Sequence, residues 1–239
     1  MNDRFFSFSK QWIIAMDDDL IVVNKPSGLL TIPDGYNQNL PSLSRLLEEE
    51  FTKVWVVHRL DKETSGLVLF ARSPQSHKFL NSQFSDRRVK KLYAAIICGH
   101  PQWQYFDIQL PLQINGDRKH RTIVNLECGK PARTEIGVIN RLEEGLTWIE
   151  ALPHTGYTHQ IRAHLAATNF PILNDSLYSQ PAPTKTLYYS PYISRIALHA
   201  HRIAFIHPTR YQSVEYSAPF PHDFLKLIGD STPIPGSLW

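Results

Sequence analysis

The sequence predicts an α+β fold in which helices flank a mixed, largely antiparallel sheet. Short segments rich in β-branched and aromatic residues outnumber the segments with helical periodicity. Most connections between these segments are short, which is typical of an α+β domain. No internal repeat and no flexible linker separates them, so we expect a single domain over residues 1–239.

The first half of the chain is expected to contain four strands, two helices and one long polar loop. The turn Asp17-Asp18-Asp19 separates the first two strands, and Pro26-Ser27-Gly28 ends the second in a loop. Ser42 is placed as the N-cap of the first helix. The expected strands are 13–16, 20–24, 54–57 and 67–71, the loop is 58–66, and the helices are 42–51 and about 75–84.

The second half continues with strands and two further helices. Thr158 is placed as the N-cap of a helix that ends at Thr168 and carries Ile161 and Leu165 four residues apart. A hairpin-like pattern precedes it, with Glu143-Glu144-Gly145 as the tightest turn signal. The expected strands are 92–98 and 202–206, the hairpin-like region runs from about 105 to 153, and the last helix lies near 222–228.

Basic residues gather in the middle of a chain whose net charge is only +3. Residues 61–133 carry a formal charge of +6, whereas residues 1–60 carry −2 and residues 134–239 carry −1. The excess is concentrated at 87–91 and 118–121, and local basic runs of this kind suit a phosphate backbone. Charge alone leaves open the alternative that both runs are ordinary solvated loops.

Nothing in the sequence indicates a membrane-spanning or secreted protein. No window approaches 18 uninterrupted apolar residues, and residues 1–10 lack the apolar segment of a secretory signal. Cys98 and Cys128 are therefore expected to be free and buried rather than joined in a disulfide. We expect a cytoplasmic protein.

The segment His58–Leu67, HRLDKETSGL, places five charged or histidine side chains among six residues, between two apolar strands. A protein core has no reason to place such side chains there, and loops on a rigid sheet often carry catalytic groups. Asp61 is a candidate nucleophile or general base. The alternative is a solvated loop with an aspartate-based turn.

A second polar segment, TGYTHQIRAHL at 155–165, crowds polar and basic side chains onto the first turn of a helix. Backbone N–H groups at this position also favour anions. Arg162 lies four residues beyond the expected N-cap, where its side chain can point back toward a carboxylate. The alternative is a helix whose arginine and histidine side chains face water.

Together, these two segments resemble the signature motifs of the RluA-type RNA pseudouridine synthases. Further resemblances to family patterns occur at NKPSGL (24–29), KLYAA (91–95), and LHA (198–200) with FIHP (205–208). The matches run in order from about residue 20 to 228 and cover nearly the whole chain. The resemblance implies one catalytic domain with a central RNA-binding cleft, and too few preceding residues for a separate N-terminal RNA-binding domain.

The resemblance implies an isomerase that converts a uridine in RNA to pseudouridine without a cofactor or a metal. The reaction breaks the N1–C1′ bond, turns the base and rejoins it through C5, with no redox step. Asp61 matches the catalytic aspartate, which acts as nucleophile or base. Arg162 matches its paired arginine, and a nearby cation lowers an aspartate pKa by roughly 1–3 units. Tyr93 matches the tyrosine that packs on the target base.

The resemblance also concerns RNA binding. A uridine in folded RNA must be flipped out, at a cost of a few kcal/mol, and Arg59 matches the residue expected to fill the gap. The expected substrate is a stem-loop of ribosomal or transfer RNA, bound by a monomer. The other expected RNA-binding residues are His58, Arg87, Arg88, Lys90, Lys91, His159 and Gln160.

Tyr157 departs from the family pattern, which usually has arginine at this position. The departure puts in doubt any RNA contact that the usual arginine would make, and with it the substrate preference.

Two alternative functions are weighed against this interpretation. A metal hydrolase could use His199, His201 and His207, but His159 and His164 are five residues apart and do not form an i, i+4 pair. A non-catalytic RNA-binding protein could retain the same fold. The presence of all three expected catalytic residues argues against it.

Overall fold

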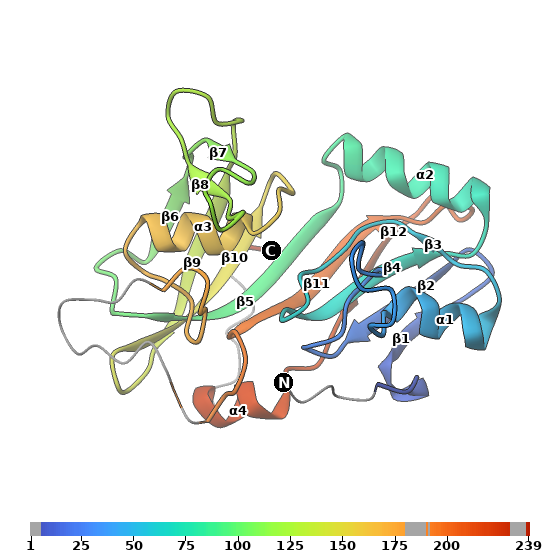
Figure 1. Ribbon diagram of the computed structural model, residues 1–239, viewed down its shortest axis with the longest axis horizontal. Coiled ribbons are helices and arrows are strands. Elements are labelled where there is room, and N and C mark those ends of the chain that lie inside the picture. Colours follow the sequence, from blue (N-terminus) through green and yellow to red (C-terminus); the bar gives the residue numbers. More distant parts are fainter. Residues whose placement is uncertain (1–5, 180–189, 191, 230–237) are drawn as a thin grey trace. The chain divides into compact units, whose positions relative to one another are not determined.

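The computed structural model describes residues 6–179, 190, 192–229 and 238–239 of the chain (Figure 1). The chain forms two compact units. Unit 1 comprises residues 1–91 and 200–219, and unit 2 comprises residues 92–199 and 220–239. The chain passes from one unit to the other three times: inside β5 after Lys91, inside β11 after His199, and between β12 and α4 after Pro219.

The strands of unit 1 follow the order β1-β2-β4-β11, with β3 paired to β4 and β12 paired to β11. The pairs β1–β2, β2–β4, β3–β4 and β11–β12 are antiparallel. The bounds are β1 Ile13–Met16, β2 Leu20–Lys25, β3 Trp55–Val56, β4 Ser65–Ala71, β11 Leu198–Ile206 and β12 Ser213–Ser217.

Both faces of β2 and β4 are buried, which explains why these strands are continuous apolar runs rather than alternating ones. One face packs with Leu80 of α2 (Pro74–Ser85). In Figure 1, α1 (Leu43–Phe51) and α2 lie on opposite sides of these strands. The residues on the α2 face are Leu20, Val22, Leu67 and Leu69, and those on the other face are Ile21, Val23, Val68 and Phe70.

The helices of unit 1 begin at polar residues. Ser42 is the N-cap of α1, as predicted. Ser73 is the N-cap of α2, and its Oγ accepts a hydrogen bond from the N–H of Ser76 at 3.1 Å. Pro74 follows at the first helical position, where the missing N–H costs nothing.

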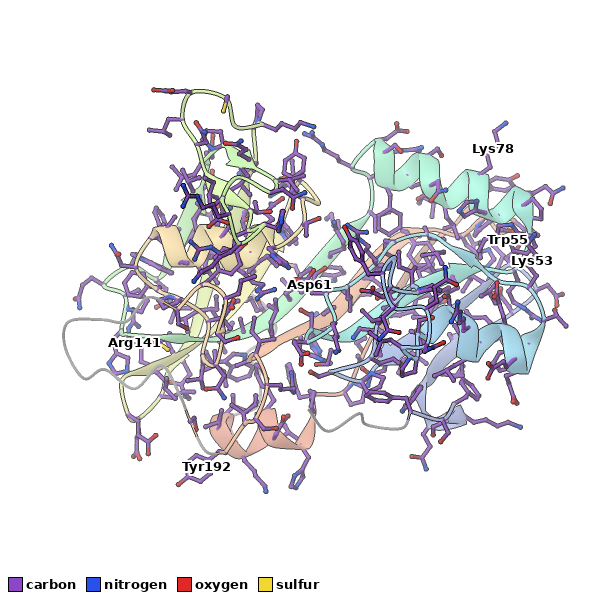
Figure 2. The ribbon with its side chains drawn as sticks, viewed as in Figure 1. Lys53, Trp55, Asp61, Lys78, Arg141 and Tyr192 are labelled. Atoms are coloured by element: carbon purple, nitrogen blue, oxygen red, sulfur yellow. The ribbon has the colours of Figure 1, made fainter. Side chains whose placement is uncertain are left out.

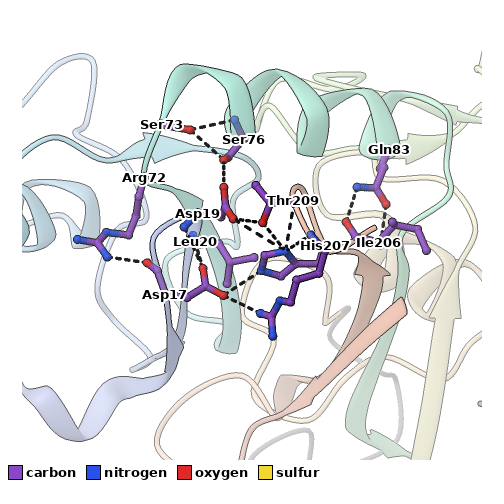
Figure 3. A network of polar contacts seen from close by, with 11 residues as sticks. Asp17, Asp19, Leu20, Arg72, Ser73, Ser76, Gln83, Ile206, His207 and Thr209 are labelled. Carbon is purple, nitrogen blue, oxygen red and sulfur yellow. Dashed lines mark hydrogen bonds and ion pairs between the residues drawn. The ribbon is translucent and has the colours of Figure 1, made fainter. Parts of the chain in front are cut away.

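A hydrogen-bond network joins the turn between β1 and β2 to the loop after β11 (Figure 3). The carboxylate of Asp17 accepts from His207 Nε2 at 2.9 Å and from Arg210 Nη2 at 2.7 Å. Asp19 accepts from Thr209 Oγ1 at 2.5 Å and from Ser76 Oγ at 2.6 Å. The network therefore holds together segments about 190 residues apart in sequence.

The side chain of Gln83 on α2 makes a second long-range connection (Figure 3). Its amide nitrogen donates to the carbonyl of Ile206 at 2.9 Å, and its amide oxygen accepts from the N–H of the same residue at 2.8 Å. Gln83 is fully buried, so these bonds satisfy polar groups that water cannot reach.

The main strands of unit 2 follow the order β5-β10-β9-β6, and β7 and β8 form a separate pair. The pairs β5–β10, β10–β9, β9–β6 and β7–β8 are antiparallel. Ile161 and Leu165 of α3, with Phe224 and Ile228 of α4, pack in the core of this unit. The bounds are β5 Lys90–Cys98, β6 Tyr105–Ile108, β7 Leu112–Gln113, β8 Ile123–Val124, β9 Thr134–Arg141, β10 Leu146–Pro153, α3 Gln160–Ala167 and α4 His222–Ile228.

The predicted α+β fold with a mixed, largely antiparallel sheet and flanking helices is confirmed. Some details differ. Helix α3 has His159 rather than Thr158 at its N-cap, and strand β12 was not predicted, because its half-exposed residues give no apolar run. Both cysteines are free, but only Cys98 is buried, whereas Cys128 is exposed. No helix within the described ranges is long and apolar enough to span a membrane.

Candidate functional site

Asp61 lies half-buried in the loop that joins β3 to β4 (Figure 2). The loop makes a tight turn here, because the N–H of Thr64 donates to the carbonyl of Asp61 at 3.1 Å. Thr64 and Ser65 are buried immediately after the turn. The backbone on the C-terminal side of Asp61 is therefore anchored in the unit, while Lys62 and Glu63 are exposed.

The last residue of β2 holds this loop in place. Lys25 is 0% exposed, and its Nζ donates to the carbonyl oxygens of Lys62 at 3.0 Å, Leu29 at 2.7 Å and Pro26 at 3.0 Å. An ammonium group has three donors, and a buried one is tolerated when they are used. Lys25 thus joins the loop after β2 to the residue that follows Asp61.

Further hydrogen bonds connect the same two loops. Ser27 Oγ donates to the carbonyl of Glu63 at 2.6 Å, and the N–H of Gly28 donates to the carbonyl of Lys62 at 2.8 Å. On the other side of Asp61, Thr31 Oγ1 donates to the carbonyl of Leu60 at 2.9 Å and accepts from its N–H at 3.2 Å. The backbone is thereby held on both sides of Asp61.

Gly66 lies at the start of β4, where a side chain would not fit. Its φ of +112° is a conformation that residues with side chains rarely adopt. A Cβ at this position would lie 2.3 Å from the carbonyl oxygen of Ala200. The glycine of the HRLDKETSGL segment therefore serves the close approach of two backbones.

His58 and Lys91 both pack against Phe84. The His58 ring stacks on Phe84 with centroids 4.8 Å apart, and Lys91 Nζ lies 5.9 Å from the Phe84 centroid. His58 Nε2 accepts the N–H of Leu69 at 3.0 Å. Burial, with a smaller effect of the Lys91 charge, lowers the pKa of His58 to about 3. A neutral His58 bonded to the backbone supports the loop and offers no charge to a phosphate.

The predicted basic residues after α2 are mostly exposed. Arg87 is exposed and has a positive φ of 57°, and Lys90 is exposed at the start of β5. Arg88 pairs with Asp86 at 2.9 Å. Burial lowers the pKa of Lys91 to about 8. Arg59, in the Asp61 loop, is also exposed.

Tyr93 belongs to unit 2. It lies half-buried on β5, opposite Ala151 of β10 in the antiparallel register, and packs against the core of that unit. The strand therefore fixes the backbone from which the phenol extends.

Arg162 lies in the first turn of α3 and is 9% exposed. Its Nε and Nη2 donate to the two carboxylate oxygens of Asp175, each at 2.8 Å. Its guanidinium carbon lies 5.1 Å from the centroid of the Tyr178 ring. Such a two-point bond fixes the plane of the guanidinium.

Asp175 and Tyr178 were not found from the sequence. Asp175 is 1% exposed and accepts the N–H groups of Leu177 and Tyr178 at 3.1 and 3.2 Å, besides its bonds to Arg162. It follows Arg162 by 13 residues, outside the helix, and no periodicity connects the two. Only the folded chain brings this carboxylate to the arginine.

Gln160, one of the predicted RNA-binding residues, has a structural role inside unit 2. It is 3% exposed, and its amide oxygen accepts from Thr155 Oγ1 at 2.8 Å and from the N–H of Tyr157 at 3.2 Å. Its amide nitrogen donates to the carbonyl of Arg133 at 3.0 Å and to Thr134 Oγ1 at 2.9 Å. These bonds use the hydrogen-bonding groups of the amide to hold the turn before α3.

His159 is half-buried at the N-cap of α3, in a left-handed conformation with φ of 56°. Its Nδ1 lies 3.2 Å from the hydroxyl oxygen of Tyr178. The predicted site residues are thus divided between the units. Asp61, His58, Arg59 and the 87–91 run belong to unit 1, and Tyr93, His159, Gln160 and Arg162 belong to unit 2.

Among the described residues, Asp17, Asp19 and His207 form a group whose ligand atoms lie within 4.8 Å of one another (Figure 3). One carboxylate oxygen of Asp17 accepts a hydrogen bond from Arg210. His207 Nδ1 accepts from the backbone N–H groups of Thr209 at 3.4 Å and Arg210 at 3.3 Å. A cation would have to displace these donors, so the group serves the fold. His201, from the same histidine-rich segment, bonds to the carbonyl of Ala218 at 2.9 Å.

Comparison with known proteins identifies the family. The model of the RNA pseudouridylate synthase family matches residues 19–167, which include both polar segments. The chain belongs to the RluA-type RNA pseudouridine synthases. It is 38% identical over 207 residues to the dual-specificity RNA pseudouridine synthase RluA of Pasteurella multocida, covering 87% of this chain and 92% of the relative. It is 33% identical over 210 residues to the protein of that name from Escherichia coli strain K12, covering 87% and 93%.

Solved structures agree with this membership. The human RNA pseudouridylate synthase domain containing 1 protein matches with a TM-score of 0.73 and 28% identity, over 87% of this chain and 83% of that one. The pseudouridine synthase described here is therefore an isomerase that converts uridine to pseudouridine in RNA.

Proposed function

We propose that this pseudouridine synthase uses Asp61 as the nucleophile or base that acts on a uridine in a stem-loop of ribosomal or transfer RNA. The observation that carries the proposal is the support of the Asp61 loop by a fully buried ammonium group, Lys25, through the carbonyl of Lys62. A loop held by buried hydrogen bonds gives a reactive carboxylate little freedom, as positioned catalysis requires.

Arg162 is proposed as the partner of Asp61. The two hydrogen bonds to Asp175 hold the guanidinium of Arg162 in one plane, which supports its role as a positioned cation. A nearby cation keeps a carboxylate ionised in a closed site.

Tyr93 and Arg59 are proposed to act on the flipped nucleotide. Tyr93 would stack on the target base, which its half-buried position on a rigid strand supports. Arg59 would occupy the place that the uridine leaves in the RNA stack, which its exposure supports.

Two basic segments are proposed to bind phosphates. One contains Arg87, Arg88, Lys90 and Lys91, and the other contains Arg118 and Lys119. His159 is also proposed to bind RNA. His58 would support RNA binding as a neutral side chain, and Gln160 would support it by holding the turn before α3.

The relatives are named dual-specificity enzymes, and we propose that this enzyme likewise modifies more than one RNA. Pseudouridine mapping of total RNA from a strain that lacks the gene would identify the missing positions. A single missing position would contradict the proposed dual specificity.

The assignment of Asp61 is tested by tritium release from 5-tritiated uridine in RNA from that strain. Asp61→Asn keeps the size of the side chain, so folding and RNA binding should stay near those of the wild type while turnover falls to background. Asp18→Asn, at an exposed position of the β1–β2 turn, is the matched control and should retain full turnover. Robust release by Asp61→Asn would show that a group other than the Asp61 carboxylate does the chemistry.

A further inference from the structure

Tyr178 stands at a junction between α3 and the basic loop before β8. It is 6% exposed, and its ring faces the guanidinium carbons of two arginines, Arg162 at 5.1 Å and Arg121 at 5.8 Å. Both distances lie within the range in which a cation is attracted to an aromatic face. All of these residues belong to unit 2.

The hydroxyl group of Tyr178 contacts a different part of the unit. It donates to the carbonyl of Thr122 at 3.0 Å and accepts the N–H of the same residue at 3.0 Å. With its hydrogen used in this way, the hydroxyl oxygen can also accept from His159 Nδ1 at 3.2 Å. Thr122 Oγ1 in turn donates to the carbonyl of Thr158, just before α3, at 2.7 Å.

The loop that ends at Thr122 has a defined conformation. Asp117 accepts the N–H groups of Lys119 and Arg121 at 3.0 and 2.9 Å and pairs with the Arg121 side chain at 2.6 Å. Arg121 Nη1 also donates to the carbonyl of Leu177 at 3.0 Å. Arg121 thus has its partners within the protein, whereas Arg118 and Lys119 are exposed on the loop.

We propose that Tyr178 is a positioning residue with two separable roles: its ring orients Arg162 for the reaction, and its hydroxyl holds the basic loop 117–122 in its RNA-binding conformation. The proposal rests on the proposed function, since it needs Arg162 at the reacting centre and Arg118 and Lys119 on phosphates. One side chain then connects RNA binding to the geometry of the catalytic arginine.

The two roles predict a separation of KM from kcat. Tyr178→Phe keeps the ring and removes the hydroxyl together with three hydrogen bonds, so KM for RNA should rise by about tenfold or more, with little change in kcat. Starting from that variant, phenylalanine analogues with one and then five ring fluorines keep the shape while weakening the attraction of a cation. Along this series kcat should fall, by about tenfold or more with five fluorines, because small displacements of catalytic groups are costly.

The matched control is Tyr192→Phe, at an exposed tyrosine of the same unit (Figure 2), which should leave kcat and KM unchanged. Thermal unfolding of every variant shows whether the fold is intact. A constant kcat along the fluorine series would overturn the role of the ring, and an unchanged KM in Tyr178→Phe would overturn that of the hydroxyl.

Arg162→Lys, measured in parallel, separates this proposal from the proposed function. If Arg162→Lys retains the wild-type kcat, the catalytic assignment of Arg162 fails. If Arg162→Lys is inactive and the fluorine series is flat, only the role of Tyr178 fails.

Discussion

The ammonium group of Lys25 and the carbonyl group of Lys62 are joined by a hydrogen bond of 3.0 Å between residues 37 apart in sequence. The bond fixes the residue next to Asp61 to the end of β2. It makes the conformation of the candidate catalytic loop depend on a side chain to which we assign no part in the chemistry.

Replacing Lys25 by methionine should therefore impair both stability and turnover. Lys25→Met removes the ammonium donor from three carbonyl groups, of which that of Lys62 keeps another donor, the N–H of Gly28, so we expect a loss of about 3 kcal/mol in the free energy of unfolding. Displacement of the loop should lower kcat by roughly 100-fold. Urea unfolding and single-turnover assays measure the two effects, with Lys78→Met, at an exposed position of α2, as the control. A stable Lys25→Met enzyme with normal kcat would show that the loop keeps its conformation without the bond.

Replacing Arg59 by alanine should slow the reaction on structured RNA far more than on a short unstructured oligonucleotide. Only the structured substrate requires the gap in the stack to be filled. Turnover of both substrates by the wild type and Arg59→Ala provides the comparison. Equal losses on both would place Arg59 in the chemical step.

Replacing Tyr93 by phenylalanine should preserve base stacking and reduce turnover. The ring remains, whereas the hydroxyl that could handle a proton is removed. Binding is measured with RNA that cannot react and turnover by tritium release. Full activity of Tyr93→Phe would limit the side chain to packing.

Removing the basic run after α2 should weaken RNA binding and flatten its salt dependence. For every phosphate interaction that is removed, the slope of log K against log salt should fall by roughly 0.7–0.9. Lys226→Ala, at an exposed position of α4, is the control for a general change of charge. An unchanged slope would identify these residues as ordinary solvated charges. The substitutions are Arg87→Ala, Arg88→Ala, Lys90→Ala and Lys91→Ala.

Lys91 should make RNA binding depend on pH. Its pKa of about 8 means that the side chain loses its charge as the pH rises from about 7 to about 9, so RNA affinity should fall over this range. The free energy of unfolding should rise with pH instead. Between the pKa of Lys91 in the folded enzyme and the ordinary pKa of lysine, the unfolded chain binds more protons than the folded one. Lys91→Arg keeps its charge and should remove the pH dependence of binding. The same pH dependence in both proteins would assign it to another group.

Much of the fold follows from local patterns. Residues 20–24 and 67–71 are apolar runs long enough for buried strands, and the charged segment between 58 and 66 has to be a loop because it cannot enter a core. The order of the five motif-like segments predicts the family, and the same segments contain the candidate catalytic residues Asp61, Tyr93 and Arg162. The division into two units could not be predicted from the sequence, because two of the three crossings between them lie inside the strands β5 and β11, and the third lies in the short connection between β12 and α4.

The sequence by itself determined most of the elements, the family and the candidate catalytic side chains, because these depend on residue type and on spacing along the chain. Tertiary structure alone decided which polar side chains form buried hydrogen bonds that stabilise the fold. Gln160 and His58 form hydrogen bonds inside their units, and Arg162 is bound by Asp175. Partners of this kind are set by how distant segments pack, and a hydrogen bond across 13 or 37 residues leaves no periodic trace in the sequence.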